Sequence, residues 1–116
     1  MIHREGNQDI KVIGHRGTLT HAHENTMYAF ESAYEMGANW VETDVTVTAD
    51  GAFVLIHDQT VDRTTDGAGT VSESSLSYIA GLDAGPWFDQ KYKDARVPVL
   101  VELLDWAETH SGVCLP

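Results

Sequence analysis

The residues best suited to chemistry in this 116-residue chain lie in three short motifs: His15-Arg16-Gly17, Glu42-Thr43-Asp44 and His57-Asp58. Histidine is the side chain best placed to exchange protons near neutral pH. Arginine binds a phosphate group through its planar set of N–H donors. Paired carboxylates suit a hard cation such as Mg²⁺ or Ca²⁺. Together these side chains indicate the cleavage of a phosphate ester.

Glu42 and Asp44 are two positions apart, so in a strand both side chains point to the same face, about 6–7 Å apart along the chain. Two carboxylates on one face repel each other unless a positive charge lies between them. A divalent cation would fill that role. Taken alone, a Glu-x-Asp pair is more often two acids on the exposed face of an edge strand.

Each of the other candidates also has a simpler interpretation. His15 and His57 could each only cap a strand by hydrogen bonding, and Arg16 could form a surface salt bridge in this acid-rich chain. His21 and His23, together with His15, allow a zinc site to be imagined, but loop histidines without a metal are the better interpretation. The three motifs together are more informative than any one of these residues alone, because the His15, Glu42 and His57 motifs each follow a short apolar run.

The hydrophobic pattern predicts the elements that position these residues. Residues 11–14 are typical of a buried strand. A helix begins at Asn25 or Thr26 and is closed by Gly37 in the left-handed conformation. Alternating residues predict a strand over 40–48, and a turn at 49–51 precedes a second strand over 53–56. A hairpin places Asp44 directly across from His57; two parallel strands also end near one rim.

The second half of the chain has weaker patterns. Residues 58–70 are polar and predict a loop over the same rim, followed by a short helix stopped by Gly81. Residues 82–88 indicate an irregular packed segment. Pro98 opens a helix that ends near Gly112, with apolar residues on one face. Residues 113–115 begin a further strand. This order predicts an α/β fold with its active residues beyond the carboxyl ends of the strands.

Composition narrows the function. The net charge of −11, from 18 acidic and 7 basic residues, argues against a nucleic-acid partner. No apolar run approaches the length of about 18 residues that a membrane span needs. The first residues, MIHREGNQDI, lack the apolar core of a signal peptide, so we expect a cytoplasmic protein with residues 1–10 as a loose segment. Cys114 is alone, which excludes an internal disulfide.

The chain resembles the glycerophosphodiester phosphodiesterase family in five strings from about Val12 to Leu104: VIGHRG, HENTMYAFESAYEMGANWVETDVTVTADGAFVLIHD, VDRTTDGAGTV, LDAGPWF and VPVLVELL. The resemblance implies a TIM-type (β/α)₈ barrel. It also implies the hydrolysis of glycerophosphodiesters to glycerol 3-phosphate and an alcohol, with a divalent cation, Mg²⁺ or Ca²⁺. The preferred alcohol and the metal stay open.

The same resemblance implies a role for each candidate residue. His15 and His57 look like the acid–base pair, and Arg16 looks like the phosphate anchor. Glu42 and Asp44 look like two of three protein ligands to the metal. One histidine would deprotonate the attacking oxygen, of water or of the neighbouring glycerol hydroxyl, and the other would protonate the leaving alkoxide. Which histidine does which is open.

Two departures from the family pattern stand out. Asn25 belongs to a motif that usually reads Pro-Glu-Asn-Thr and would help shape the site, but His23 stands in the place of the proline. The third metal carboxylate is expected after the strand that begins at residue 113, beyond Pro116. Glu102 is a poor substitute because it lies in a helix. Since a TIM barrel needs about 250 residues, residues 11–116 resemble the amino-terminal part of the domain, truncated before that ligand.

Other functions fit the same residues. A related barrel phospholipase acting on phosphoinositides or sphingolipid headgroups has the same broad chemistry, although the strings between Asp62 and Phe88 favour the glycerophosphodiester enzymes. A partial barrel could also be an inactive binding or assembly piece. Such a barrel leaves strand edges unpaired and apolar helix faces uncovered. We therefore expect marginal stability, self-association into a homo-oligomer, or completion by another chain.

Overall fold

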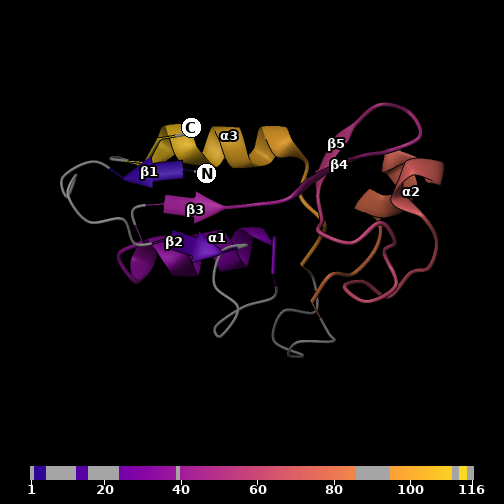
Figure 1. Cartoon of the computed structure of the whole chain (residues 1–116), viewed down its shortest axis with the longest axis horizontal. Helices are drawn as coiled ribbons and strands as arrows, with labels where there is room; N and C mark the ends of the chain where they lie inside the picture. Colours follow the sequence, from indigo (N-terminus) through magenta and orange to yellow (C-terminus); the bar gives the residue numbers. More distant parts are fainter. Residues whose placement is uncertain are drawn as a thin grey trace.

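The computed structural model describes residues 2–4, 13–15, 24–38, 40–85, 95–110 and 113–114, and it includes the side chains of 24–38, 41–85 and 95–110. Figure 1 shows two parts: a sheet with two helices, and a hairpin with a short helix and loops beside it. The molecule measures 42 × 30 × 20 Å, and its long axis runs from one part to the other.

The larger sheet has four short strands in the order β2-β3-β1-β6: Ile13–His15, Trp40–Glu42, Ile2–Arg4 and Val113–Cys114. Strands β2 and β3 are parallel. Strand β1 is antiparallel to both β3 and β6, so β3 and β6 run in the same direction. The strands predicted near residues 11–14, 40–48 and 113–115 are therefore present.

The prediction that residues 1–10 form a loose segment is wrong for Ile2–Arg4, which form β1; residues 5–10 lie outside the described residues. Strand β3 has a second edge next to β1, where its N–H and C=O groups need partners. Three residues of β1 supply them, with Ile2 opposite Val41. So short a strand depends on its neighbours and has no alternating pattern of its own.

Helix α1 (Met27–Glu35) connects β2 to β3 and has the predicted ends. The hydroxyl of Thr26 caps it by accepting from the N–H of Ala29 at 3.2 Å. Gly37 follows its carboxyl end with φ of 93°, a conformation that glycine adopts without steric cost.

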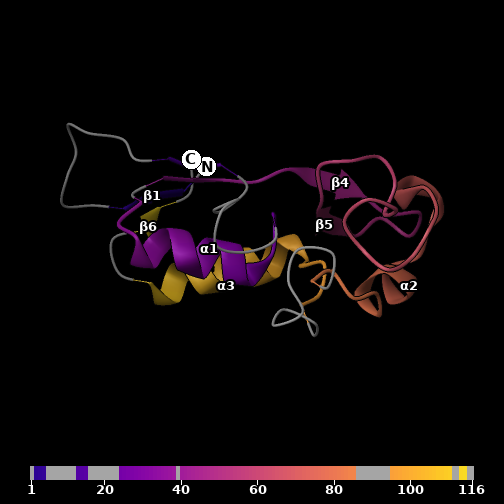
Figure 2. The same ribbon diagram turned by 90° about the horizontal axis from the view of Figure 1, so that it is seen from below.

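Helix α3 (Leu100–Thr109) connects β3 to β6 after the long hairpin and loop segment. The sequence pattern predicts its start at Pro98, and the helix begins two residues later. Glu102 reaches back from the first turn and accepts from the N–H of Val99 at 3.2 Å. It ends at Thr109, three residues before Gly112. Figure 2 shows α1 and α3 on the same side of the strands, as expected for two right-handed crossovers that step across a sheet in one direction.

The predicted strand over 40–48 is divided. Strand β3 ends at Glu42, and β4 (Val45–Val47) begins after a two-residue break and pairs with β5 (Phe53–Leu55) as an antiparallel hairpin. The hairpin alternative is therefore confirmed over the parallel one. The break arises because the chain changes partners: β3 pairs within the larger sheet, whereas β4 pairs with β5 in a separate two-stranded sheet.

The predicted register of the hairpin is wrong by one residue. Asp44 lies across from Ile56, whose N–H donates to the Asp44 carbonyl at 3.1 Å, and His57 is the next residue along. The cause is the turn, because the N–H of Thr48 donates to the carbonyl of Ala52 at 2.9 Å and closes a three-residue loop. Gly51 takes the left-handed conformation that such a loop requires, with φ of 85°.

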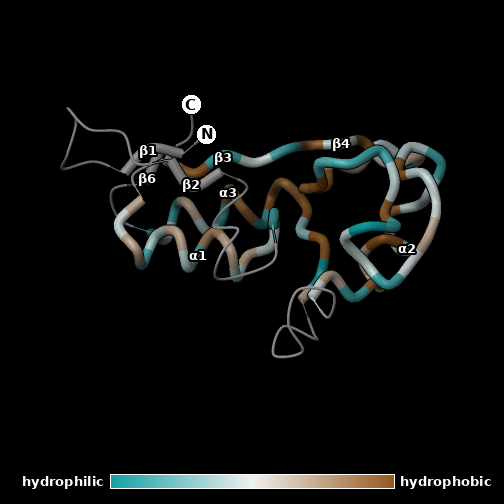
Figure 3. The backbone as a smooth tube through the Cα atoms, turned by 60° about the horizontal axis from the view of Figure 1, so that its bottom comes forward, coloured by the Kyte–Doolittle hydropathy of each residue, from teal (hydrophilic) through white to brown (hydrophobic). Residues whose placement is uncertain are grey.

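Two hydrophobic clusters stabilise the two parts. The cluster under the larger sheet contains residues of α1, of the loop after α1, and of β3, β5 and α3: Phe30, Ala33, Ala38, Val41, Leu55, Leu103 and Ala107. The cluster beside the hairpin contains Val54, Ile56, Val61, Val71, Ile79, Ala84 and Val97. Successive residues of a strand face opposite sides, so β5 contributes to both clusters and joins the two parts. Figure 3 shows hydrophobic segments around β3 and α3 and again around α2.

The segment after β5 contains two short helical pieces, a 3₁₀ turn η1 (Val71–Glu73) and helix α2 (Leu76–Ala80), which is stopped by Gly81 as predicted. Residues 86–94, which include the last three residues of the irregular segment expected over 82–88, lie outside the described residues. None of the helices in the described ranges is long and apolar enough to cross a membrane.

Candidate active site

The parallel pairing of β2 and β3 sets His15 beside Glu42. Their Cα atoms are register partners at the carboxyl ends of the two strands. Neighbouring strands lie about 4.8 Å apart, so the two positions belong to one rim of the sheet. This is the placement that the sequence pattern predicts for these residues.

Asn25 connects the start of α1 to the chain that leaves β3. Its Nδ2 donates to Oδ2 of Asp44 at 3.2 Å, and its Oδ1 accepts from the hydroxyl of Thr43 at 2.9 Å. Asn25 is buried and has φ of 55°, which asparagine tolerates better than most residues. Its side chain therefore fixes the two residues at which β3 gives way to β4.

Glu42 and Asp44 have the donor chemistry for a divalent cation. Both side chains are half-buried and carry carboxylate oxygens, the ligands that Mg²⁺ and Ca²⁺ prefer. The amide of Asn25 donates to one oxygen of Asp44 and so orients that carboxylate. In the part of the chain that the structure describes, no three His, Cys, Asp or Glu residues are grouped to hold a metal ion. These two carboxylates therefore fit part of a cation site.

His57 follows β5 and projects from the hairpin toward solvent, with its side chain 46% exposed. Its Nδ1 lies 3.0 Å from Oδ1 of Asp58. An ionised carboxylate only accepts hydrogen bonds, so we assign the proton of the neutral ring to Nδ1. Within the described residues, Nε2 makes no hydrogen bond. The ring is thus held on one side and open on the other.

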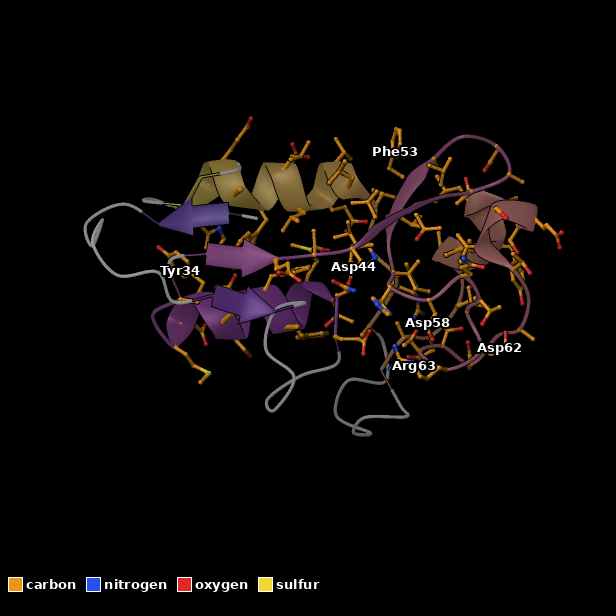
Figure 4. All side chains as sticks on the ribbon, viewed as in Figure 1. Tyr34, Asp44, Phe53, Asp58, Asp62 and Arg63 are labelled. Atoms are coloured by element: carbon orange, nitrogen blue, oxygen red, sulfur yellow. The ribbon has the colours of Figure 1, made fainter. Side chains whose placement is uncertain are left out.

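Arg63 links Asp58 to Glu24 through two pairs of hydrogen bonds. Its Nε and Nη2 donate to the two oxygens of Asp58 at 2.8 and 3.0 Å. Its Nη1 and Nη2 donate to the two oxygens of Glu24 at 2.9 and 3.0 Å. Figure 4 shows Arg63 and Asp58 side by side on the loop below the hairpin, with Asp44 beyond the end of β3.

The charges of this network reinforce one another. The hydrogen bonds from Arg63, and after them the contact with His57, hold the pKa of the Asp58 carboxyl well below its usual range. Asp58 and Glu24 in turn raise the pKa of the Arg63 guanidinium. Asp58 therefore stays ionised throughout the neutral range and keeps a negative charge against the His57 ring.

A small cavity lies between the residues just before α1 and the end of β5. Its wall includes Glu24 and Asn25 from the start of α1 and Ile56 and His57 from the end of β5. Asn25 holds Asp44, and Glu24 is tied through Arg63 to the neighbour of His57. The cavity is thus lined by His57 and by Asn25, the hydrogen-bond partner of Asp44.

The structure brings together most, but not all, of the candidates from the sequence. His15 and Glu42 are register partners, and Asn25 holds Asp44 near the His57 segment. The phosphate-anchor candidate Arg16 and the loop histidines His21 and His23 lie outside the described residues.

Sequence reasoning assigned no role to Glu24, Asp58 or Arg63. Glu24 and Asp58 are neighbours of residues that it did single out, and Arg63 stands in a polar loop. The pairing of Glu24 with Arg63 spans 39 positions. The excess of acids over bases was the available signal, since a buried carboxylate in such a chain needs a specific cation.

The strands and helices that form this rim define an α/β fold, and comparison with known proteins identifies the family. The family model for the glycerophosphoryl diester phosphodiesterase family matches residues 15–113. The chain belongs to this family. Its members generally depend on a divalent metal.

Individual relatives support the assignment. The chain is 48% identical over 94 residues to a glycerophosphodiester phosphodiesterase of Caldanaerobacter subterraneus, covering 81% of this chain and 39% of the relative. It is 36% identical to a glycerophosphodiester phosphodiesterase of Bacillus subtilis, covering 89% and 38%. The chain thus spans about two fifths of the length of these relatives.

Solved structures confirm the fold. A glycerophosphodiester phosphodiesterase from Agrobacterium tumefaciens matches with a TM-score of 0.82 and 42% identity, covering 87% of this chain and 43% of that one. An Oleispira antarctica phosphodiesterase in complex with the product sn-glycerol-3-phosphate matches with a TM-score of 0.80 and 40% identity, covering 83% and 39%. These neighbours are TIM-barrel phosphodiesterases, so the predicted fold class, the amino-terminal part of such a barrel, is confirmed.

Proposed function

We propose that this chain contributes the amino-terminal half of the active site of an enzyme that hydrolyses glycerophosphodiesters to glycerol 3-phosphate and an alcohol. The observations that support the proposal are the register pairing of His15 with Glu42 and the hydrogen bond from Asn25, which lines a cavity with His57, to Asp44. The relative solved with sn-glycerol-3-phosphate supports the choice of product.

Glu42 and Asp44 would hold the divalent cation, Mg²⁺ or Ca²⁺, as two of its protein ligands. When bound, the cation neutralises charge that develops on the phosphoryl oxygens. It also explains how a chain with a net charge of −11 binds an anionic substrate. Asn25 keeps Asp44 oriented for this role, and Arg16 would grip the phosphate beside it.

The two histidines would move the protons. One takes the proton of the attacking oxygen, of water or of the neighbouring glycerol hydroxyl, as that oxygen forms its bond to phosphorus. Attack by the hydroxyl would give a cyclic phosphate, which water would then open to glycerol 3-phosphate. The other gives a proton to the alkoxide as its bond to phosphorus breaks. His57 would act through Nε2, because its Nδ1 faces the ionised Asp58.

The direct test is hydrolysis of glycerophosphocholine by the full-length protein, measured as the release of glycerol 3-phosphate. We expect turnover with added Mg²⁺ or Ca²⁺ and its loss with a chelator. The His15→Ala variant should lose about 10²–10⁴-fold in kcat. Thr46→Val is a suitable control, since Thr46 lies on β4 and bonds only the Ile56 carbonyl among the described contacts of its hydroxyl. Equal kcat in His15→Ala and the parent would exclude the assigned role.

Asp44→Asn separates the metal from the histidines. The substitution keeps the shape of the side chain but removes the charge that the cation needs. We expect the metal concentration at half-maximal activity to rise at least about tenfold, while the circular dichroism spectrum stays unchanged. An unchanged metal requirement would remove Asp44 from the proposed ligands.

A further inference from the structure

The guanidinium of Arg63 spans two carboxylates that come from distant parts of the chain. One belongs to Asp58, the neighbour of His57, and the other belongs to Glu24, just before α1. All three guanidinium nitrogens donate hydrogen bonds, and both oxygens of each carboxylate accept one. Such a paired geometry fixes direction as well as distance, which a lysine ammonium does not.

The burial of Glu24 distinguishes this network from an ordinary surface salt bridge. Its side chain is only 7% exposed, so its charge depends on partners within the protein. Arg63 itself is 45% exposed and would otherwise sample many conformations. The buried carboxylate of Glu24 therefore fixes the guanidinium of Arg63, and the guanidinium in turn fixes the carboxylate of Asp58.

Glu24 and Asn25 are consecutive residues that hold the two sides of the site. Asn25 donates to Asp44, the metal-ligand candidate at the end of β3. Glu24 accepts from Arg63, which holds Asp58 beside His57. Both residues are buried, at 7% and 3% exposure. These two consecutive residues just before α1 thus set the distance between the Asp44 carboxylate and the His57 ring.

We propose that Arg63 is a positioning residue, which fixes the Asp58 carboxylate against Nδ1 of His57 and leaves Nε2 as the nitrogen that exchanges protons with the substrate. This role rests on the proposed function, since it needs His57 to act on a substrate. The tautomer of the ring is the physical quantity that the network controls. Without a fixed acceptor at Nδ1, the ring is free to carry its proton on either nitrogen and to turn.

The test compares Arg63→Met with Arg96→Met in the full-length protein. Arg96 is exposed, and its recorded contact is with the neighbouring carbonyl of Ala95, so its replacement removes the same charge outside the network. The first measurement is the tautomer of the neutral His57 ring by ¹⁵N NMR. We expect the proton on Nδ1 in the parent and in Arg96→Met, and a mixture of both tautomers in Arg63→Met. Asp58→Asn serves as the reference for a lost carboxylate, because its amide also offers Nδ1 of His57 a donor.

The second measurement is kinetic. A positioning role predicts that Arg63→Met lowers kcat by about 10- to 100-fold while KM stays within about threefold. Arg63→Lys keeps the charge without the paired geometry and should recover only part of the loss. Arg96→Met should keep the parent kcat. Should Arg63→Met fail to fold, Arg63→Lys and Glu24→Gln carry both measurements.

The two measurements separate this proposal from the proposed function. An unchanged His57 tautomer in Arg63→Met, with a changed one in Asp58→Asn, overturns the role of Arg63 whatever the activity is. A parent protein without phosphodiesterase activity overturns the proposed function, while the tautomer shift still reports on the network. A kcat that falls equally in Arg63→Met and Arg96→Met also contradicts positioning, because charge alone would then explain the loss.

Discussion

Two histidines, His57 and His110, each contact a carboxylate but lie in different parts of the molecule. His57 stands beside Asp58 and Arg63 at the end of β5. His110 follows α3 and contacts Glu31 of α1 through Nε2 at 2.9 Å. In Figure 4, Asp58 and Arg63 lie in one part of the molecule and Tyr34, which packs against His110, lies at the far end of α1.

The surroundings of the two rings differ in a way that separates chemistry from structure. His110 uses both nitrogens, because Nδ1 lies 2.7 Å from the carbonyl of Trp106. Its ring packs against the rings of Tyr34 and Trp106, with centroids 5.1 and 4.3 Å away. Its side chain is 22% exposed, against 46% for His57. A ring held on every side serves to join helices, whereas a ring held on one side can exchange a proton.

The largest expected contrast between the two histidines is catalytic. We expect His57→Ala to lower kcat on glycerophosphocholine by about 10²–10⁴-fold, because the proposed proton carrier is lost. His110→Ala should change kcat by less than about threefold at a temperature where the protein is folded. The measurement is steady-state kinetics on both variants, with circular dichroism to confirm folding. Comparable losses of kcat would refute the distinction between a catalytic and a structural ring.

The sequence identified the strongly patterned elements and misjudged those that depend on neighbours. Helices α1 and α2 were predicted close to their observed ends, because caps and glycines mark them locally. The hairpin was predicted but its register was not, because the register depends on a three-residue loop that looks the same as a two-residue one in sequence. Strand β1 escaped notice because its pairing with β3 and β6 is what makes it a strand.

The candidate site shows the same division. Residue type and position after an apolar run were enough to select His57 and Asp44, and the family likeness gave them roles. Nothing in a single sequence relates Glu24 to Arg63 across 39 positions, so the network behind His57 was missed. His110 was also passed over, since its contacts come from the packing of α3 on α1. Local sequence patterns therefore indicate the candidate residues, but they do not indicate the long-range contacts that hold those residues in place.

An intermediate effect is expected where the structural histidine is anchored. Nε1 of Trp106 donates to the same Oε2 of Glu31 that His110 contacts. Trp106→Phe keeps an aromatic ring but removes this donor. We therefore expect the free energy of unfolding to fall by roughly 1 kcal/mol, allowing for the partial exposure of Glu31. The activity per folded molecule should stay at the parent level. Urea denaturation and steady-state kinetics on one preparation measure both.

A loss of activity in Trp106→Phe without a loss of stability would contradict the comparison, because it would connect the α1–α3 contact directly to the reaction. Val101→Ala is the control, since Val101 lies on the same helix as Trp106 and is 58% exposed. We expect it to change the free energy of unfolding less than Trp106→Phe does.

The smallest expected effect concerns the pH dependence of stability at the catalytic end. Hydrogen bonds from Arg63 lower the pKa of the Asp58 carboxyl below its ordinary value of 3.8. A carboxyl whose pKa is depressed in the folded state stabilises the protein above its unfolded-state pKa, and this stabilisation is lost as the pH falls toward the folded-state value. Since Arg63 is 45% exposed, solvent screening limits the contribution to roughly 0.5 kcal/mol at neutral pH.

Asp58→Asn removes this titration, so its free energy of unfolding should decline less steeply than that of the parent below about pH 4. The two curves, measured by urea denaturation from pH 7 to pH 2, are expected to approach each other at the acidic end. Glu31→Gln tests the same kind of substitution at the structural histidine. Parallel curves for the parent and Asp58→Asn would mean that Arg63 does not hold an ionised Asp58, and the charge that orients His57 would then need another source.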